Sequence, residues 1–196
     1  MSIGALLPKR VRASRTRVDN PEPSALVRRF GSRLADAAAG MPVLDVACGS
    51  GRNAMFLFQL GCTVVCVDKD LTRLHTQLHL ACHEAPARLS FRHTDLIEGP
   101  WPFSACTVGG IVNVHFLHSK LFPFFESSLS AGGYLILETV PGCGGNYLEL
   151  PRAGEVRCAF DKAFDFEVYK ERKAGPRSCD AVTVRMLARR RTDRST

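Results

Sequence analysis

The strongest constraint on the fold is a glycine-containing turn that joins an apolar segment to a helical one. Residues 43–47 form a short apolar run, Gly49 and Gly51 follow at once, and the pattern of residues 53–60 predicts a helix. Because glycine has no Cβ, the backbone of such a turn can bend sharply and approach a ligand closely. The first N–H groups of the helix point into the same crevice. This strand–turn–helix unit therefore predicts a nucleoside-binding site at the end of the strand.

The rest of the chain alternates between apolar runs and amphipathic stretches, which is the pattern of an α/β protein. The last two apolar runs are expected to close the sheet as an antiparallel pair. We therefore predict a Rossmann-like, doubly wound and mostly parallel seven-stranded sheet with an antiparallel terminal strand. The predicted strands are 43–47, 63–67, 88–93, 108–114, 134–139, 164–170 and 181–187, and the predicted helices are 22–39, 53–60, 71–83, 117–129 and 155–160.

Basic residues concentrate at the two ends of the 196-residue chain. Eight Lys or Arg residues stand against two acidic ones in 1–33, and five Arg against one Asp in 185–196, although the formal net charge is only +7. We therefore predict one domain at 21–190, between a flexible basic tail at 1–20 and a short basic tail at 191–196. Such tails suit nucleic acid or an acidic partner, or they are solvated ends without a partner.

The composition predicts a cytoplasmic protein. Its eight cysteines are scattered without a Cys-x-x-Cys pair, as expected of free thiols in a reducing compartment. No apolar run approaches the roughly 18 residues that cross a bilayer, so we expect no membrane partner. The alternative is a mitochondrial targeting segment at 1–18, which is rich in Arg and free of acids, although Pro8 interrupts its amphipathic pattern.

Three histidines recur at intervals of four residues in the predicted helix 71–83. This spacing places His75, His79 and His83 on one helical face. Such a face either binds a metal ion or is simply solvated. We favour the solvated face and predict no metal site.

Two aspartates indicate which nucleoside cofactor the glycine turn suits. The run Gly49-Ser-Gly51-Arg-Asn-Ala54 has the spacing of a dinucleotide fingerprint, so NAD is one candidate. Asp45, four residues before the first glycine, would repel a pyrophosphate but attract an ammonium group. Asp68, at the end of the next strand, can accept hydrogen bonds from both hydroxyl groups of a ribose. The combination favours S-adenosyl-L-methionine, which has an ammonium group and a ribose but no phosphate.

Several segments resemble a known family. Residues 43–53 (VLDVACGSGRN) resemble motif I of class I S-adenosylmethionine-dependent methyltransferases, and residues 60–68 (LGCTVVCVD) are similar to the tellurite-resistance branch of that family. Residues 93–96 (HTDL) resemble the segment whose Asp and next backbone N–H bind the adenine edge. The resemblance implies cofactor-binding roles for Asp45, Ala47, Cys48, Gly49, Gly51, Asn53, Asp68, Lys69, Asp95, Leu96 and Asn113.

One position departs from the family pattern. The family usually has Asp at the opening of the fourth strand, where this chain has Gly109. Since glycine weakens a strand, we expect this substitution to loosen the strand entry. The cofactor residues named above are not affected.

The methyl acceptor has to be inferred from the end of the fourth strand, where a transferred methyl group would lie. A thiolate, a selenolate or a tellurium oxyanion needs no general base, whereas an amine or an alcohol needs one. His115 and His118 are the candidate catalytic bases at this place. Glu138 and Glu155 lie near the same edge and are candidate acceptor ligands.

We predict a methyltransferase that acts on a small acceptor with a soft heteroatom or metalloid. The compact chain and the family resemblance favour this hypothesis. The alternative is a tRNA or protein methyltransferase whose basic tails hold the target. A third hypothesis is a partner subunit that binds the cofactor without transferring a methyl group.

Overall fold

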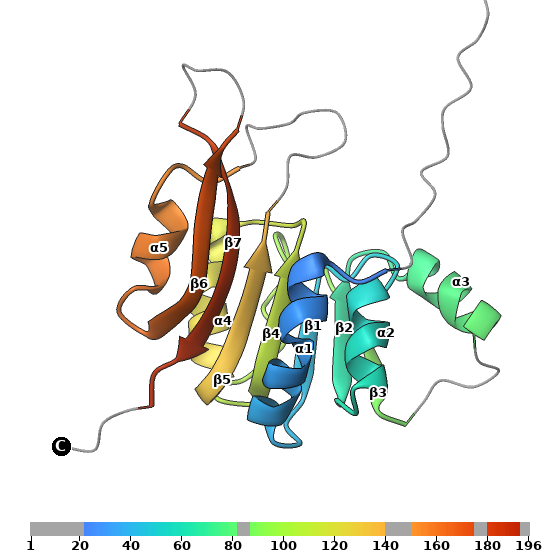
Figure 1. The fold of residues 1–196 in the computed structure, drawn as a ribbon. Helices are drawn as coiled ribbons and strands as arrows, with labels where there is room; N and C mark the ends of the chain where they lie inside the picture. Colours follow the sequence, from blue (N-terminus) through green and yellow to red (C-terminus); the bar gives the residue numbers. More distant parts are fainter. Residues whose placement is uncertain (1–21, 82–86, 140–149, 175–179, 193–196) are drawn as a thin grey trace, which may run out of the picture.

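The computed structural model folds around one seven-stranded sheet, with the order β3-β2-β1-β4-β5-β7-β6 (Figure 1). It describes residues 22–81, 87–139, 150–174 and 180–192. The pairs within β1 to β5 are parallel, and β7 is antiparallel to both β5 and β6. This confirms the predicted fold class. The strands are β1 (Val43–Val46), β2 (Val64–Asp68), β3 (Leu89–His93), β4 (Val108–Val114), β5 (Leu129–Glu138), β6 (Phe164–Lys173) and β7 (Val182–Arg190).

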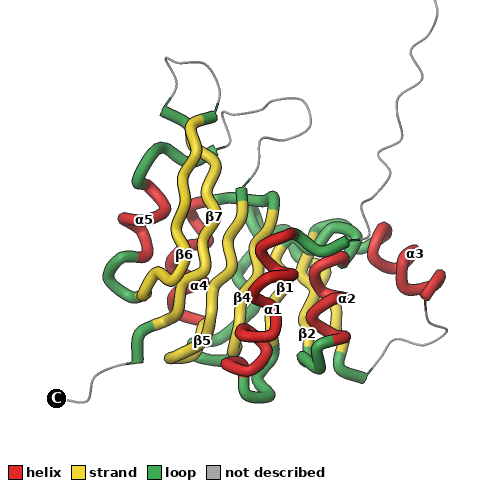
Figure 2. Tube along the Cα trace, in the orientation of Figure 1, coloured by secondary structure: helices red, strands yellow, loops and turns green. Residues whose placement is uncertain are grey.

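Helices cover both faces of the sheet (Figures 1 and 2). One apolar core lies between the sheet and the first helices, and a second core lies on the opposite face under α4 and α5. Because parallel strands are covered on both sides, β1 and β4 are buried along their whole length. The helices are α1 (Ala25–Ala38), α2 (Arg52–Gln59), α3 (Thr72–Ala81), α4 (Phe122–Ser128) and α5 (Glu155–Phe160), with a 3₁₀ turn η1 (Ser119–Leu121) before α4.

The start of α1 is tied to the start of α2. Ser24 is the N-cap of α1, and its Oγ accepts a hydrogen bond from the N–H of Val27 at 3.1 Å. The Ser24 N–H itself donates to Oδ1 of the buried Asn53 at 2.9 Å. The chain entering the domain is thereby fixed next to the glycine turn.

The segment after β4 differs from the prediction. Instead of a helix over 117–129, η1 is followed by the short α4, and β5 already begins at Leu129. Proline is favoured in the first turn of a helix, so Pro123 marks the beginning of α4. Leu129 pairs with Val108, and the register shifts before the main pairing begins at Tyr134. The strand predicted at 134–139 therefore begins earlier, and residues 130–133 form an irregularity inside this longer strand.

The expectation that Gly109 loosens the strand entry stays a prediction: the register of β4 with β5 shifts between Val108 and Gly110, while α1 packs against β4 at this position. Gly109 lies inside β4, and its N–H donates to the carbonyl of Pro42 at 2.9 Å. A Cβ at this position would lie 2.6 Å from Cα and 2.7 Å from the carbonyl oxygen of Ala38. The glycine therefore allows the end of α1 to approach the sheet closely.

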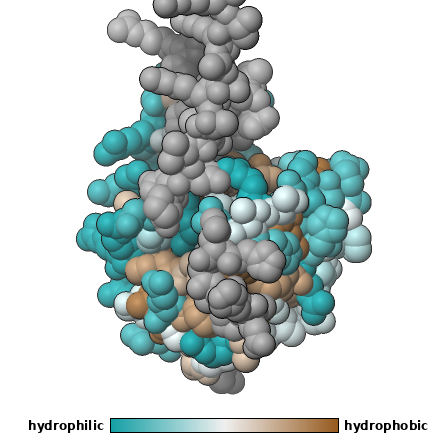
Figure 3. Space-filling model, turned by 90° about the vertical axis from the view of Figure 1, so that its right-hand side faces the viewer, coloured by the Kyte–Doolittle hydropathy of each residue, from teal (hydrophilic) through white to brown (hydrophobic). Residues whose placement is uncertain are grey.

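Among the described residues, few large apolar side chains are exposed. On the face seen from the β3 edge, apolar residues form a patch between hydrophilic ones (Figure 3). None of the described helices has the length and apolar character needed to cross a membrane. Most of the two predicted basic tails and the glycine-rich segment 141–145 lie outside the described residues, so the proposed domain boundaries at 21 and 190 stay predictions.

Candidate active site

The turn after β1 has the conformation that its glycines permit. Ala47, Gly49 and Gly51 all have positive φ angles, of 53°, 56° and 78°. The N–H of Cys48 donates to the carbonyl of Val67 at 3.1 Å, and the N–H of Gly51 returns to the carbonyl of Cys48 at 2.9 Å. The turn is therefore tight, is attached to β2, and delivers the chain directly into the first turn of α2.

Asp68 connects the turn to the end of β2. Its Oδ2 accepts a hydrogen bond from the N–H of Gly49 at 2.8 Å, and its Oδ1 accepts one from the N–H of Asp70 at 3.0 Å. The carboxylate is only partly buried and borders a pocket. Asp68 can therefore hold the turn and bind a ligand at the same time, because each carboxylate oxygen has a second lone pair.

Asp45 lies beneath the turn and is 1% exposed. Its Oδ2 accepts a hydrogen bond from the N–H of Ala54 at 2.9 Å, so it caps the beginning of α2 from below. Burial raises the pKa of Asp45 to about 7, although the Ala54 hydrogen bond and the Arg52 charge act in the opposite direction; the charge of Asp68 adds to the increase. Asp45 is not among the residues that line the pocket.

The raised pKa of Asp45 predicts a pH-dependent stability. The folded protein keeps this proton up to about pH 7, whereas the unfolded chain releases it near pH 4. Between these values the folded state binds more protons, so the free energy of unfolding falls as pH rises, by at most about 1.4 kcal/mol per pH unit. We expect urea denaturation between pH 4 and 7 to show this loss in the wild type, and Asp45→Asn to remove it.

The control for this measurement is Asp165→Asn, which removes an exposed aspartate that pairs with Arg191. It should leave the contribution of Asp45 in place. If Asp45→Asn and Asp165→Asn gave the same slope of stability against pH, Asp45 would not hold its proton in the folded protein.

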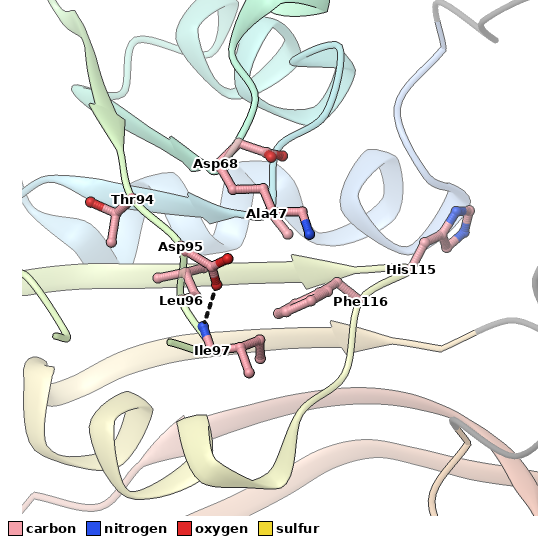
Figure 4. A pocket seen from close by; sticks show the side chains of 9 residues that line it. Ala47, Asp68, Thr94, Asp95, Leu96, Ile97, His115 and Phe116 are labelled. Atoms are coloured by element: carbon pink, nitrogen blue, oxygen red, sulfur yellow. Dashed lines mark hydrogen bonds between the residues drawn. The ribbon is translucent and has the colours of Figure 1, made fainter. Parts of the chain in front are cut away.

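A pocket of about 270 Å³ opens at the carboxyl ends of β1, β2, β3 and β4 (Figure 4). This size is near the lower end for small-molecule sites. Six predicted site residues line it: Ala47, Asp68, Lys69, Asp95, Leu96 and His115. Sequence reasoning missed three further lining residues, Thr94, Ile97 and Phe116, although each is adjacent in sequence to a residue that was predicted.

Asp95 is held by the backbone that follows it. Its Oδ1 accepts hydrogen bonds from the N–H groups of Ile97 at 2.9 Å and Glu98 at 3.3 Å, and these bonds lower the pKa of Asp95. The carboxylate is therefore ionised at neutral pH and can accept hydrogen bonds in the pocket. Figure 4 shows Asp95 on the pocket wall with the apolar side chains of Ile97 and Phe116 nearby.

His115 stands at the rim where β4 ends. It has a positive φ of 66°, and its N–H donates to the carbonyl of Glu138 at 2.8 Å. Its ring points away from Asp95 and Leu96 (Figure 4), and its Nδ1 lies 3.4 Å from Nη2 of Arg52. Because a guanidinium can only donate, Nδ1 is the acceptor in this contact.

Other predicted site residues lie outside the pocket lining. Cys48, Gly49 and Gly51 form the turn, and the side chain of Asn53 is engaged with Ser24. Both amide atoms of Asn113 and Nδ1 of His118 are buried and have no hydrogen-bond partner within the described part of the chain. The proposed roles of these residues stay predictions.

Glu155 and His75 are also not among the residues that line the pocket. Oε2 of Glu155 accepts a hydrogen bond from the N–H of Arg152 at 2.9 Å, at the beginning of α5. The ring of His75 packs against Phe91 with 5.2 Å between centroids. His83 lies outside the described residues, so the predicted absence of a metal site in 71–83 stays untested.

Solved structures share this architecture, whereas no protein-family model and no curated protein matches the sequence. The 1,6-didemethyltoxoflavin-N1-methyltransferase of Burkholderia thailandensis, solved with bound S-adenosylhomocysteine, is 14% identical, with a TM-score of 0.57 over 86% of this chain and 79% of its own. TehB from Haemophilus influenzae is 20% identical, with a TM-score of 0.57 over 81% of this chain and 62% of its own. The chain has the methyltransferase fold.

The methyltransferase fold does not by itself assign a reaction. The [4+2]-cyclase SpnF also has it, with 13% identity and a TM-score of 0.62 over 83% of this chain and 80% of its own. Function depends on the residues that a fold carries at its site. The cofactor and the reaction therefore have to be argued from the pocket.

Proposed function

We propose that the protein is an S-adenosylmethionine-dependent methyltransferase that acts on a small acceptor with a soft nucleophilic atom, of the thiol, selenium or tellurium type. The main support for this choice of cofactor is the charge of the pocket. Two carboxylates, Asp68 and Asp95, and one cation, Lys69, line it. A net negative pocket repels a pyrophosphate but accepts hydrogen bonds from the hydroxyl and amino groups of a nucleoside.

The residues present fit the parts of this cofactor. Asp68 would bind the ribose hydroxyls, and Asp95 with the backbone N–H of Leu96 would bind the adenine edge. The apolar side chains of Ile97 and Phe116 offer a wall for the base, and the backbone of the turn 47–51 would hold the amino-acid end. When bound, S-adenosylmethionine supplies a methyl group on a sulfonium that is already activated for displacement. The chain has to align the acceptor with that group and exclude water.

The environment of His115 supports a soft acceptor. Its Nδ1 faces Arg52, so this nitrogen is occupied by a permanent donor and is poorly placed to remove a proton from an amine or an alcohol. A thiolate or a metalloid oxyanion reacts without a base. The resemblance of residues 60–68 to the tellurite-resistance branch and the structural similarity to TehB support the same acceptor class. The macromolecular alternative rests on the tails, and no described feature favours it.

Replacement of Asp68 tests the cofactor site. We expect Asp68→Ala to weaken the binding of S-adenosylhomocysteine by about 2 kcal/mol, or about 30-fold, because charged hydrogen bonds to the ribose are lost. The hydrogen bond from the N–H of Gly49 to Asp68 is lost at the same time, which also weakens cofactor binding. Isothermal titration calorimetry measures the change.

Asp70→Ala is the matched control. Asp70 is an exposed aspartate two residues away, and its Oδ1 accepts a hydrogen bond from the N–H of Thr72 at the beginning of α3. This variant should bind S-adenosylhomocysteine like the wild type. An unchanged affinity in Asp68→Ala would exclude Asp68 as a ribose ligand, and a wild type that binds no S-adenosylhomocysteine would exclude the proposed cofactor.

A further inference from the structure

A buried carboxylate stands one strand beyond the pocket. Glu138, the last residue of β5, is 3% exposed. Its Oε1 lies 2.8 Å from Nε of Arg185, its register partner on β7. Its Oε2 is buried and, within the described part of the chain, has no hydrogen-bond partner. Buried polar atoms are nearly always hydrogen-bonded in folded proteins, because an unpaired one keeps its full desolvation cost.

The position of Glu138 relates it to the acceptor. The pocket lies at the ends of β3, β2, β1 and β4, and β5 is the next strand in the sheet. The ends of β4 and β5 lie side by side (Figure 1), and the N–H of His115 donates to the carbonyl of Glu138 at 2.8 Å. Adjacent strands are about 4.8 Å apart, so Glu138 is within the length of a small molecule from the pocket rim.

The charges around Oε2 of Glu138 indicate what kind of ligand group would pair with it. Arg185 already balances the charge of Glu138, and its side chain is 50% exposed while that of Glu138 is 3% exposed. A buried carboxylate is favourable only when its remaining lone pairs are also satisfied. A hydroxyl or an amino group on a ligand would satisfy Oε2, whereas a ligand carboxylate would be repelled by it.

We propose that Oε2 of Glu138 accepts a hydrogen bond from the methyl acceptor, so that the acceptor carries an O–H or N–H group next to its soft nucleophilic atom. This inference rests on the proposed function and narrows its substrate class. Glu138 determines specificity, and Arg185 is a positioning residue that fixes the direction of the carboxylate.

Four thiols with the same nucleophilic atom test this inference: ethanethiol, 2-mercaptoethanol, cysteamine and thioglycolate. Calorimetry measures their binding to the complex with S-adenosylhomocysteine, and methylation rates, corrected for the fraction of thiolate, give kcat/KM. We expect the wild type to bind 2-mercaptoethanol and cysteamine about tenfold more tightly than ethanethiol, the range for one charged hydrogen bond, and to bind thioglycolate most weakly.

Glu138→Gln then tests the residue itself. The amide oxygen can stay with Arg185 while the NH₂ group takes the place of Oε2, so an acceptor atom becomes a donor. The preference for cysteamine over ethanethiol should fall to within about twofold, less than one hydrogen bond contributes, because an ammonium group can only donate and loses its acceptor. Glu167→Gln is the matched control, because Glu167 on β6 pairs with Arg33 at a distance from the pocket, and its thiol preference should equal that of the wild type.

The outcomes separate the two proposals. A wild type that binds S-adenosylhomocysteine but binds ethanethiol as tightly as 2-mercaptoethanol, or prefers thioglycolate, overturns the inference and leaves the cofactor assignment intact. An unchanged preference in a folded Glu138→Gln variant overturns it as well. If thermal unfolding shows that this variant is not folded, the comparison of the four thiols with the wild type decides whether the inference holds. A wild type that binds no S-adenosylhomocysteine overturns both proposals.

Discussion

Gly109→Ala is expected to lower the free energy of unfolding by about 3 kcal/mol, the upper range for an overpacked core. The added Cβ would lie 2.6 Å from Cα and 2.7 Å from the carbonyl oxygen of Ala38. Both contacts are backbone atoms, so no rotamer change relieves them. The C-terminal turn of α1 has to move away from the sheet, which opens a packed core. Urea denaturation at an unchanged m value measures the loss.

Gly110→Ala is the matched control in the same strand. Its Cβ would meet the side chain of Leu34, with Cδ2 at 2.8 Å and Cγ at 2.9 Å. A leucine side chain can adjust, so we expect a cost of about 1 kcal/mol. Equal losses in the two variants would show that the backbone contact of Gly109 is not what limits the substitution.

Gly51→Ala is expected to lower both stability and cofactor affinity. The φ of Gly51 is 78°, and a left-handed conformation costs an alanine about 1–2 kcal/mol. Its Cβ would also lie 2.2 Å from Cδ1 of Leu74, which is fully buried. We expect a total loss of about 3 kcal/mol, because core displacement adds to the strain. The turn and the beginning of α2 shift together, so the affinity for S-adenosylhomocysteine should fall at least about tenfold.

Gly61→Ala is the control that separates the cost of backbone strain from the effect of distorting the glycine turn. Gly61 follows α2 and has a φ of 94°, but a Cβ there has nothing within 4 Å. We expect it to cost about 1 kcal/mol through strain alone and to leave cofactor affinity unchanged. Calorimetry and thermal unfolding of both variants check this. If Gly61→Ala reduced the affinity as much as Gly51→Ala, the effect would be general destabilisation and not a distortion of the turn.

The succession of strands and helices along the chain and part of the pocket wall were accessible from local patterns. Asp68 and Asp95 each follow an apolar run, and the structure places both in the pocket. In a parallel sheet the residues after successive strands gather at one edge, so their proximity needs no knowledge of packing. The boundary between α4 and β5 was not accessible in this way, because Leu129 joins the sheet only through its pairing with Val108.

Packing between distant segments changed the interpretation of single residues. Asp45 was expected to attract an ammonium group, which stays a prediction; the structure adds that the beginning of α2 lies over it and supplies the N–H of Ala54. Gly109 was expected to loosen a strand, which also stays a prediction; the structure adds that the end of α1 lies against it. In both cases the decisive neighbour belongs to a helix that packs on the strand, and the residue's own sequence context does not contain it.

The sequence by itself determined the sheet, the glycine turn and the residues that stand at the carboxyl ends of the first strands, because periodicity and glycine placement act over a few residues. Only the tertiary structure decided that the ring of His115 points away from Asp95, that Asp45 is buried with a raised pKa, and that Oε2 of Glu138 has no hydrogen-bond partner among the described residues. These properties depend on distances of a few ångströms between segments far apart in the chain. No local pattern encodes such distances, since they result from the packing of the whole core.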